Sequence, residues 1–560
     1  MQHLTGLLGL GVVALSLLLS GCGGSRYSDS ATNPSQSAGQ VATSAANQVG
    51  FFAASRFAEQ ASFGPTTALV AELRQKGFER WIDEQFALRP SQGDMTPMRD
   101  YTDPPPSAQV NTYRETFPNI AVAGADQLRA RVTWSLSQFI VVSQRKVDLI
   151  GEMVWINLLQ AQGLGNYADL LYALSISPAM GVYLDNNQNR PKSTECPHCA
   201  PNENFARELM QLFSLGVFQL NADGTPVRDA KGKFVETYSQ RDVEELARVL
   251  TGWQLSNEPP NRPNRNYGNW EKPMVPSTWP PERDSGSKTV MGRTFAAGQS
   301  QEQDLRSAVS MLMEHPNIAP FVSLRMIQHL VKSNPTPAYV GRVAAKFRNN
   351  GQGVSGDMKA VVKAALLDSE ARAGDKPELS RADDGKFREP YLHNTALWRG
   401  LNCKRVPRYP WGDGTSPVRP PQQGGFEAES VFGYYAPTDR APGSNLLAPE
   451  QKLANASEFT ERLNLANARR WNDTAQRNDL TVFDAAGCDV ATITTAYALS
   501  PRMFNDYLSE HFFRGAMPPT LRSNIEQLIK QPQWDTQDPS EGAMRLLDFA
   551  LTSPYHGVIK

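Results

Sequence analysis

The spacing of the apolar residues is the feature that most constrains this 560-residue chain. In many segments they recur every three or four positions, the interval that places them on one face of an α-helix. The run 204–215 is the clearest example, because its large apolar residues form one stripe and Gly216 follows as a stop signal. The pattern predicts a mainly α protein, a multi-helix globular body with long irregular loops.

Start and stop signals divide the helical pattern into separate elements. Thr66 or Thr67 can cap a helix that follows Gly64-Pro65, and Gly77 breaks the next apolar stretch into two helices. Ser239 can cap a later helix by accepting a hydrogen bond from the amide of Asp242. Helices are expected at 55–63, 69–86 with the break at Gly77, within 128–174, and at 204–215, 241–250, 304–314, 318–333, 337–349 and 358–367, with further helices beyond 449.

Two stretches lack helical spacing. Turn residues at 221–224 and 229–232 flank short Val and Phe runs, which predicts a small β-hairpin within 219–238. Residues 259–298 are rich in Pro, Trp, Asn and Arg without any periodicity. We expect that stretch to be a long ordered loop.

The first 22 residues are typical of an exported lipoprotein. An apolar run from Leu4 to Leu19 is too short to span a bilayer well, and it ends in Leu19-Ser20-Gly21-Cys22. We expect residues 1–21 to be a lipoprotein signal peptide and the Cys22 thiol to carry the acyl chains that hold the protein on a lipid bilayer. Residues 1–3 lack Lys and Arg, so a plain secretory peptide is the alternative, and it also means export. Gly23 in place of Asp favours the outer membrane within the cell envelope.

Composition divides the rest of the chain. Residues 22–50, after the lipidated Cys22, form a flexible tether of small polar residues. A helical N-terminal lobe is expected at 51–375, and a helical C-terminal lobe with a Pro/Gly-rich insertion at 376–560. Because 56 basic and 57 acidic residues nearly cancel, no overall field favours nucleic acid.

Four cysteines follow the lipidation site, and an even number in an oxidising compartment favours disulfides. Of the three possible pairings we expect Cys196–Cys199 and Cys403–Cys488, since the first pair is already local. The Cys196-Pro197-His198-Cys199 motif leaves two alternatives, thiol–disulfide chemistry and zinc binding. The flanks lack the strand pattern of a thioredoxin-like fold, and zinc would need distant ligands.

Familiar catalytic signatures such as Gly-x-Ser-x-Gly and His-Glu-x-x-His do not occur, and we expect no metal and no cofactor. Asp185 and Asn187 begin a run of oxygen-bearing side chains that resembles half of a calcium loop. Arg190 stands where such a loop needs Gly, so a turn or cap role is the alternative.

Charged residues gather on two helices that follow. Spacings of three and four put them on one face, where they pair within a helix or bridge two helices. The alternative is a polar pocket between helices with Glu203 or Glu208 as acid or base and Arg207 as anion clamp. The candidate catalytic residues are Glu203, Arg207, Glu208, Asp242 and Arg248, and the candidate binding residues are Asp185, Asn187, Asn204 and Trp253.

Several motifs resemble a known bacterial family. They include Phe57–Thr66, Asn202-Glu203-Asn204-Phe205-Ala206-Arg207-Glu208-Leu209, Tyr238–Val243 running to Trp253, Arg388-Glu389-Pro390 and Ser430-Val431-Phe432-Gly433-Tyr434-Tyr435-Ala436-Pro437. The chain is similar along nearly its whole mature length to the domain-of-unknown-function family numbered 1800.

The resemblance implies an exported, mainly helical protein without an established activity. Members are often encoded beside an exported sulfatase-like family, which implies a shared pathway. Many carry a Trp-His-Asn-His type segment where this chain has 153–158, and both histidines are replaced here. We therefore expect a lipid-anchored envelope protein with a binding or assembly role, whose partner is an envelope protein, a polysaccharide or a sulfatase-like protein. The alternative is a hydrolase or other enzyme acting on an envelope or extracellular polymer.

Overall fold

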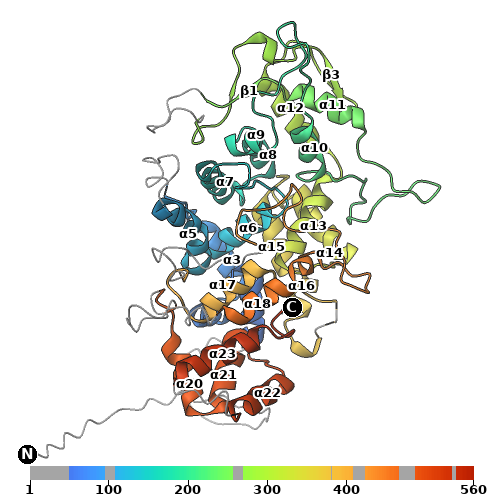
Figure 1. Cartoon of the computed structure of the whole chain (residues 1–560). Helices are drawn as coiled ribbons and strands as arrows, with labels where there is room; N and C mark the ends of the chain where they lie inside the picture. The colour runs from blue at the N-terminus through green and yellow to red at the C-terminus, as the bar shows by residue number, and fades with distance from the viewer. Residues whose placement is uncertain are drawn as a thin grey trace, which may run out of the picture. The chain divides into compact units, whose positions relative to one another are not determined.

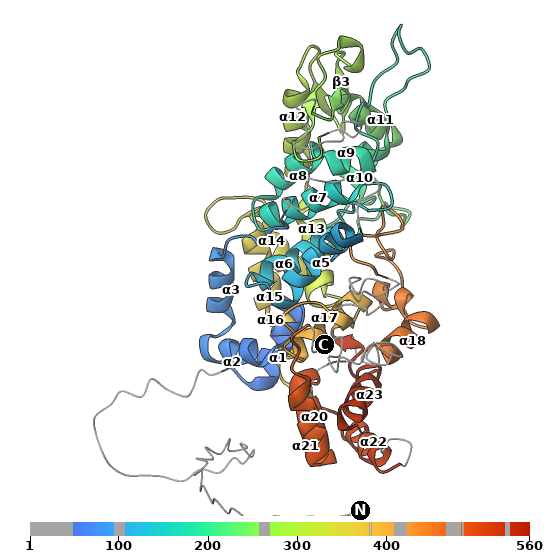
Figure 2. The same ribbon diagram turned by 60° about the vertical axis from the view of Figure 1, so that its left-hand side comes forward.

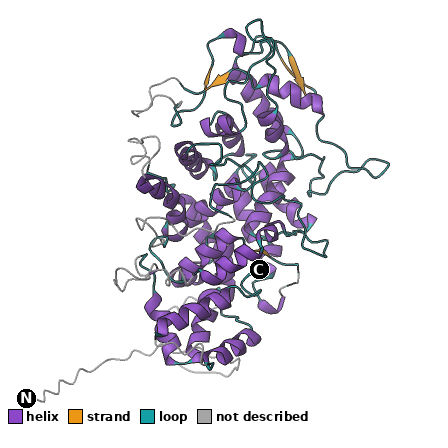
Figure 3. Ribbon diagram, viewed as in Figure 1, coloured by secondary structure: helices purple, strands orange, loops and turns teal. Residues whose placement is uncertain are grey.

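Helices account for most of the described chain, and several of them begin at a residue whose side chain caps the first turn (Figures 1 and 3). The computed structural model describes residues 49–94, 107–256, 269–379, 381, 383–407, 423–465, 483, 486–531 and 538–560. The predicted signal peptide, Cys22 and nearly all of the tether lie outside the described residues. The fold is mainly α, as the sequence predicts.

The helices in the first two thirds of the chain are α1 (Phe51–Ala61), α2 (Thr67–Lys76), α3 (Phe78–Ala87), α5 (Ser107–Ala123), α6 (Gln127–Ser137), α7 (Leu149–Gln162), α8 (Tyr167–Ser175), α9 (Pro178–Tyr183), α10 (Asn204–Gln211), α11 (Gln240–Val249), α12 (Gln301–Glu314), α13 (Ile318–Leu330), α14 (Pro337–Arg348), α15 (Met358–Leu367) and α16 (Ser369–Ala373). Those that follow are α17 (Pro390–Gly400), α18 (Ala456–Asn464), α20 (Val490–Leu499), α21 (Pro501–Phe512), α22 (Pro519–Ile529) and α23 (Pro539–Leu551).

The predicted start and stop signals operate as expected. The Thr66 hydroxyl accepts a hydrogen bond from the amide of Leu69 at 3.1 Å, and Gly77, with φ 77°, separates α2 from α3. Ser239 and Asp242 form a reciprocal capping box at the start of α11. These local signals place the helix ends before any tertiary contact is considered.

Helix α10 is shorter than the apolar stripe predicts. It ends at Gln211, although the expected helix runs to residue 215. The amides of Phe213 and Leu215 reach back five residues, to the carbonyls of Glu208 and Met210, so the regular α-helical ladder stops there. The stretch after α10 is therefore a wide turn, and it becomes part of the pocket described below.

Short antiparallel strand pairs complete the structure. They are β1 (Trp253–Gln254) with β2 (Val275–Pro276), β3 (Lys288–Val290) with β4 (Arg293–Phe295), and β5 (Lys386–Phe387) with β6 (Val558–Ile559). The predicted hairpin at 219–238 is present as a series of isolated antiparallel bridges between 218 and 236, and its turns close at Gly224 and Gly232. It is the green loop that extends to the right in Figure 1.

Residues 259–268 of the expected long loop lie outside the described residues. In the remainder the expectation is wrong at two places, where β2 pairs with β1 and where β3 and β4 form a hairpin. Met291 and Gly292, with φ 45° and φ 80°, provide the two positive φ angles that a tight two-residue hairpin turn needs. The buried Lys288 side chain pairs with the buried Asp304 at 3.0 Å. Strands are recognised in a sequence by alternating apolar and polar residues, and in the three-residue β3 a charged residue, Lys288, occupies a buried position where an apolar one is expected.

Gln48–Lys560 make one compact unit, and its buried apolar side chains form three clusters. The largest draws on residues 54–371, and the second on Val122 and residues 397–551. The third contains residues from both stretches, such as Trp134 and Phe426, together with Tyr391, whose ring stacks on that of Trp134 with ring centres 4.1 Å apart. The division into lobes at residue 375 stays a prediction.

Helix α13 lies at the centre of the large cluster. It packs against α6, α14 and α15, and most of its residues are buried. In both Figure 1 and Figure 2 it lies among these helices, while α20–α23 group together elsewhere in the unit. Within the described ranges, no helix is long and apolar enough to cross a membrane.

Candidate ligand-binding pocket

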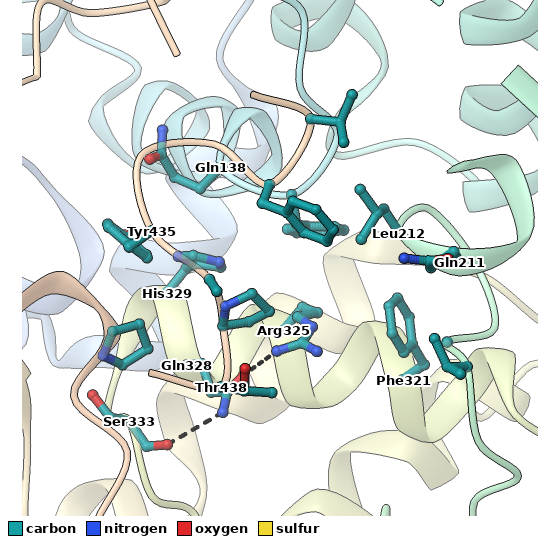
Figure 4. Close-up of a pocket in the computed structure, with 18 of the residues that line it drawn as sticks. Gln138, Gln211, Leu212, Phe321, Arg325, Gln328, His329, Ser333, Tyr435 and Thr438 are labelled. Atoms are coloured by element: carbon teal, nitrogen blue, oxygen red, sulfur yellow. Dashed lines mark hydrogen bonds between the residues drawn. The ribbon is translucent and has the colours of Figure 1, made fainter. Parts of the chain in front are cut away.

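A pocket of about 280 Å³ opens beside α13 (Figure 4). Phe321, Arg325 and His329 follow one another along the face of α13 that lines it, because residues three and four apart share a helix face. The end of α10 contributes Gln211 and Leu212, which Figure 4 shows across from Phe321 and Arg325. Phe139 and residues 431–438 complete most of the lining, which is mainly apolar.

The segment 426–438 is fixed over α6 and the turn that follows it. The Ser143 hydroxyl donates to the carbonyl of Ala428 at 2.6 Å, and the amide of Gln144 donates to the carbonyl of Phe426 at 3.1 Å. Gly433 has φ 80°, and a Cβ atom there would come within 3.1 Å of the carbonyl oxygen of Gln138. A side chain at residue 433 would push this segment outwards, so glycine keeps the pocket wall in place.

A buried carboxylate, Glu389, anchors the inner end of that segment. Its Oε2 atom accepts hydrogen bonds from Tyr435 at 3.0 Å and Gln423 at 2.8 Å, and its Oε1 atom accepts one from Trp134 at 2.9 Å. Burial opposes ionisation of Glu389, but Lys386, Arg131 and the hydrogen bonds from Trp134 and Gln423 hold its pKa below its ordinary value. Tyr435 is thereby fixed at the pocket wall.

The floor of the pocket contains ionisable side chains, His329, Arg325 and Glu450, among its mainly apolar lining. Burial lowers the pKa of His329 well below its ordinary value, and the neighbouring cations Lys386, Arg325 and Arg131 lower it further, so the ring is neutral at pH 7. Glu450 pairs with Lys386 at 2.9 Å, and burial still raises the pKa of Glu450.

Arg325 differs from the other cations of the floor. Its Nη1 atom donates to Oε1 of Gln328 at 2.9 Å, and its guanidinium lies 5.2 Å from the centre of the Phe321 ring. Among the described residues, no carboxylate lies within ion-pair distance of it. Burial alone lowers the pKa of Arg325 to about 10, so it is charged at pH 7 without a countercharge.

Large apolar side chains are exposed at the pocket rim. Val217, Phe218 and Phe432 line the pocket and remain 42%, 39% and 44% exposed. Phe234, 41% exposed, lies beside Phe218 with ring centres 5.1 Å apart. Exposed apolar residues that gather around a concave site are typical of binding surfaces.

The sequence-predicted polar residues lie elsewhere, mostly in separate pairs. Asp185 pairs with Lys146 at 2.6 Å and accepts a hydrogen bond from Asn204 at 2.9 Å. Glu203 pairs with Arg207 at 2.7 Å, and Gln240 of α11 joins the pair, so that α10 and α11 are bridged.

Two other candidates, Arg248 and Asp242, have structural contacts. Arg248 pairs with Glu245 and Asp284, at 2.9 Å and 2.8 Å. Asp242 caps α11 and accepts a hydrogen bond from the amide of Met291 at 2.7 Å. These contacts join α11 to the β3–β4 hairpin and its flanks.

Asn187 and Trp253 belong to one backbone junction. The Asn187 side chain accepts a hydrogen bond from the amide of Leu255, and the carbonyl of Trp253 accepts one from the amide of Gln188. The Trp253 ring is buried in the large cluster. Asn187 and Trp253 therefore lie close together, and neither of them lines the pocket beside α13.

Glu208 stands apart from the paired groups. It is only 8% exposed, and its Oε2 atom has no hydrogen-bond partner among the described residues. Burial raises the pKa of Glu208 to about 7, against the lowering effect of Arg207. Its charge in turn adds to burial in raising the pKa of Tyr183 and of Tyr238 to about 12 each. A carboxyl of this kind can exchange a proton near neutral pH.

Both expected cysteine pairs, Cys196–Cys199 and Cys403–Cys488, are at disulfide distance. In the described part of the chain, no group of three or more His, Cys, Asp or Glu side chains is arranged to hold a metal ion.

Sequence reasoning did not find the pocket, although two signals point to it. Arg325 and His329 are polar residues four apart on a helix that is otherwise largely apolar, which marks a polar spot on a buried face. The wall segment 430–437 carries a motif that resembles a known family, but its sequence alone does not place it against α13. Joining the two required the tertiary structure.

A family model described as "Protein of unknown function (DUF1800)" matches residues 56–556. The chain belongs to this family. The match covers α13, the end of α10 and the 426–438 segment, and hence the whole lining of the pocket. No curated protein and no solved structure matches the chain.

Proposed function

We propose that this DUF1800 protein is a lipid-anchored protein of the bacterial cell envelope whose body binds a small molecule in the pocket beside α13. The observation that carries the binding role is the apolar pocket itself, with Phe218 and Phe432 exposed at its rim and an unpaired cation in its floor. Ligand sites combine an apolar lining with a few polar groups in this way.

The anchor is proposed from the sequence around Cys22, which supplies the thiol that acylation requires. Expression of the wild type and of Cys22→Ala in a Gram-negative host with an alkyne-tagged fatty acid tests it. The wild type should carry the label and sediment with the outer membrane, whereas Cys22→Ala should carry none. An unlabelled wild-type protein would refute the anchor without affecting the pocket.

The binding role is tested by a thermal-shift screen of the full chain, purified in detergent, against small apolar, anionic and neutral compounds. A ligand at 100 times its Kd adds about 2.7 kcal/mol to the free energy of unfolding, so a hit should raise the Tm measurably. Val217→Trp, which places an indole at the rim, should abolish the shift. Shifts that are equal in the wild type and in Val217→Trp would place binding elsewhere.

The same rim could instead bind a macromolecule, which would give the protein an assembly role. Its partner would be an envelope protein or polysaccharide, with an exported sulfatase-like protein as the first candidate. Exposed Phe218, Phe234 and Phe432 support it, because side chains of this type dominate binding energy at interfaces. Crosslinking from Phe432 in intact cells should capture such a partner, and crosslinking from the exposed Leu499 serves as the control.

A hydrolase or other enzyme that acts on an envelope or extracellular polymer is the second candidate. It is favoured by one observation, the raised pKa of Glu208 beside Tyr183 and Tyr238. Release of reducing ends or acidic fragments from envelope polymers by the wild type, and its loss in Glu208→Gln, would establish it. Equal turnover by both proteins would exclude Glu208 as the acid or base.

A further inference from the structure

The unpaired guanidinium of Arg325 restricts the kind of molecule that the pocket can take. Arginine has five N–H donors, and the Arg325 side chain makes a single hydrogen bond within the described chain, to Gln328. The Arg325 side chain is partly buried, and a charge that is partly withdrawn from water is costly unless a countercharge compensates it. An anionic ligand would supply that countercharge.

The neighbouring charges do not neutralise Arg325. Lys386 is paired with Glu450, and Glu389 acts on Arg131 and Lys386. These four groups balance one another, so the positive charge of Arg325 is left over.

The rest of the lining suits an apolar body. Phe139, Leu212 and Phe321 line the same pocket as Arg325, and in Figure 4 Leu212 faces Arg325 and Phe321 from across the opening. The volume of about 280 Å³ is near the lower end of the range for ligand sites, roughly 300 to 1,000 Å³. A short organic acid is of that size.

We propose, building on the small-molecule pocket above, that its ligand is a small organic carboxylate whose apolar body packs against Phe139, Leu212 and Phe321 and whose carboxylate is bound by Arg325. The planar guanidinium matches a carboxylate in a two-point hydrogen-bonded pair, and the low-polarity surroundings strengthen it. Gln328 keeps the guanidinium oriented from the next turn of α13.

Isothermal titration of the full chain with octanoate, octanol and acetate tests the proposal. Octanoate should bind, octanol should bind at least tenfold more weakly, and acetate should not bind measurably. Arg325→Met should weaken octanoate binding at least tenfold and leave octanol binding unchanged, since only the charged contact is removed.

Arg306→Met is the matched control, because Arg306 also lies over an aromatic ring, that of Tyr172, at 4.5 Å and is not part of this pocket. It should bind octanoate like the wild type. Melting curves of each variant show that it is folded.

Three outcomes would overturn the proposal. Equal binding of octanoate and octanol, or wild-type octanoate affinity in Arg325→Met, would refute anion recognition and leave the apolar pocket standing. Octanoate binding that survives Val217→Trp would place the site elsewhere. Failure of both octanoate and octanol to bind the wild type would overturn this inference together with the proposed small-molecule role.

Discussion

Replacing Glu208 by Gln should change how the stability of the protein depends on pH. The pKa of Glu208 is raised from 4.5 to about 7 in the folded protein, so between these values the folded state holds a proton that the unfolded state has lost. Stability therefore falls as the pH rises from about 4.5 to about 7 and stays lower above it. A shift of this size corresponds to about 3 kcal/mol at pH 8.

Glu208→Gln removes the titrating group while keeping its shape. The variant and the wild type should be about equally stable at pH 5, and the variant should be more stable at pH 8 by up to about 3 kcal/mol. Denaturant unfolding followed by tryptophan fluorescence, at half-unit steps from pH 5 to pH 8, measures the difference directly. Comparing variant with wild type cancels the contributions of the other titrating groups.

Glu203→Gln, at the N-cap of the same helix, provides the control. Glu203 is partly exposed and paired with Arg207, so its replacement breaks that pair and should not reproduce the gain in stability at pH 8. If the difference between wild type and Glu208→Gln is constant across pH 5 to 8, the raised pKa of Glu208 is refuted, and with it the physical basis of an acid or base at this position.

Three further changes test how the unit is held together. The buried Glu59 carboxylate pairs with the buried Arg388 and with Arg514, which is nearly buried. Glu59→Gln removes that carboxylate from both arginines, so it should lower the free energy of unfolding by about 3 to 5 kcal/mol, and an unchanged unfolding midpoint would refute the contribution of this ion-pair network. Replacing Cys403 and Cys488 together by Ser opens a loop of 85 residues and should cost about 4 to 5 kcal/mol, measured by denaturant unfolding without reductant; a cost below about 1 kcal/mol would contradict it. Ser239→Ala removes the cap of α11 and should cost about 1 kcal/mol in the same assay, whereas a more stable variant would contradict the capping-box account.

Features of the fold that depend only on residues close together in the sequence can be predicted from it. The bounds of α15 (Met358–Leu367), the Thr66 and Ser239 caps and the break at Gly77 are all encoded within a few positions. Turn residues likewise predict the positions of both turns, at Gly224 and Gly232, in the hairpin between residues 218 and 236. Local backbone preferences and helix periodicity are sufficient for these features.

The pocket could not be predicted in this way, because its lining comes from positions between 138 and 450. Periodicity shows that one face of α13 is buried, but it does not show which segment covers that face. The 426–438 segment has no helical or strand period of its own, and it is held by single hydrogen bonds to residues distant in the sequence, Gln144, Ser143 and Glu389. Such contacts are specified by the tertiary fold alone.

The polar candidates illustrate the same limit. The spacing of four between Glu203 and Arg207 correctly suggests that they can pair, whereas nothing local distinguishes Glu208, the residue after Arg207, as an unpaired buried acid. Glu208 lies close enough to Tyr183 and Tyr238 to raise the pKa of both, and these tyrosines belong to other segments of the chain. The sequence therefore predicts the Glu203–Arg207 ion pair, but it does not predict the raised pKa of Glu208.

The central claim is that the pocket beside α13 is a ligand-binding site, and a crystal structure of the protein grown with octanoate tests it most directly. The account predicts octanoate in the pocket, with its carboxylate within about 3.2 Å of the Arg325 guanidinium and its chain against Phe139, Leu212 and Phe321. An empty pocket, or octanoate bound only at another position, would contradict it.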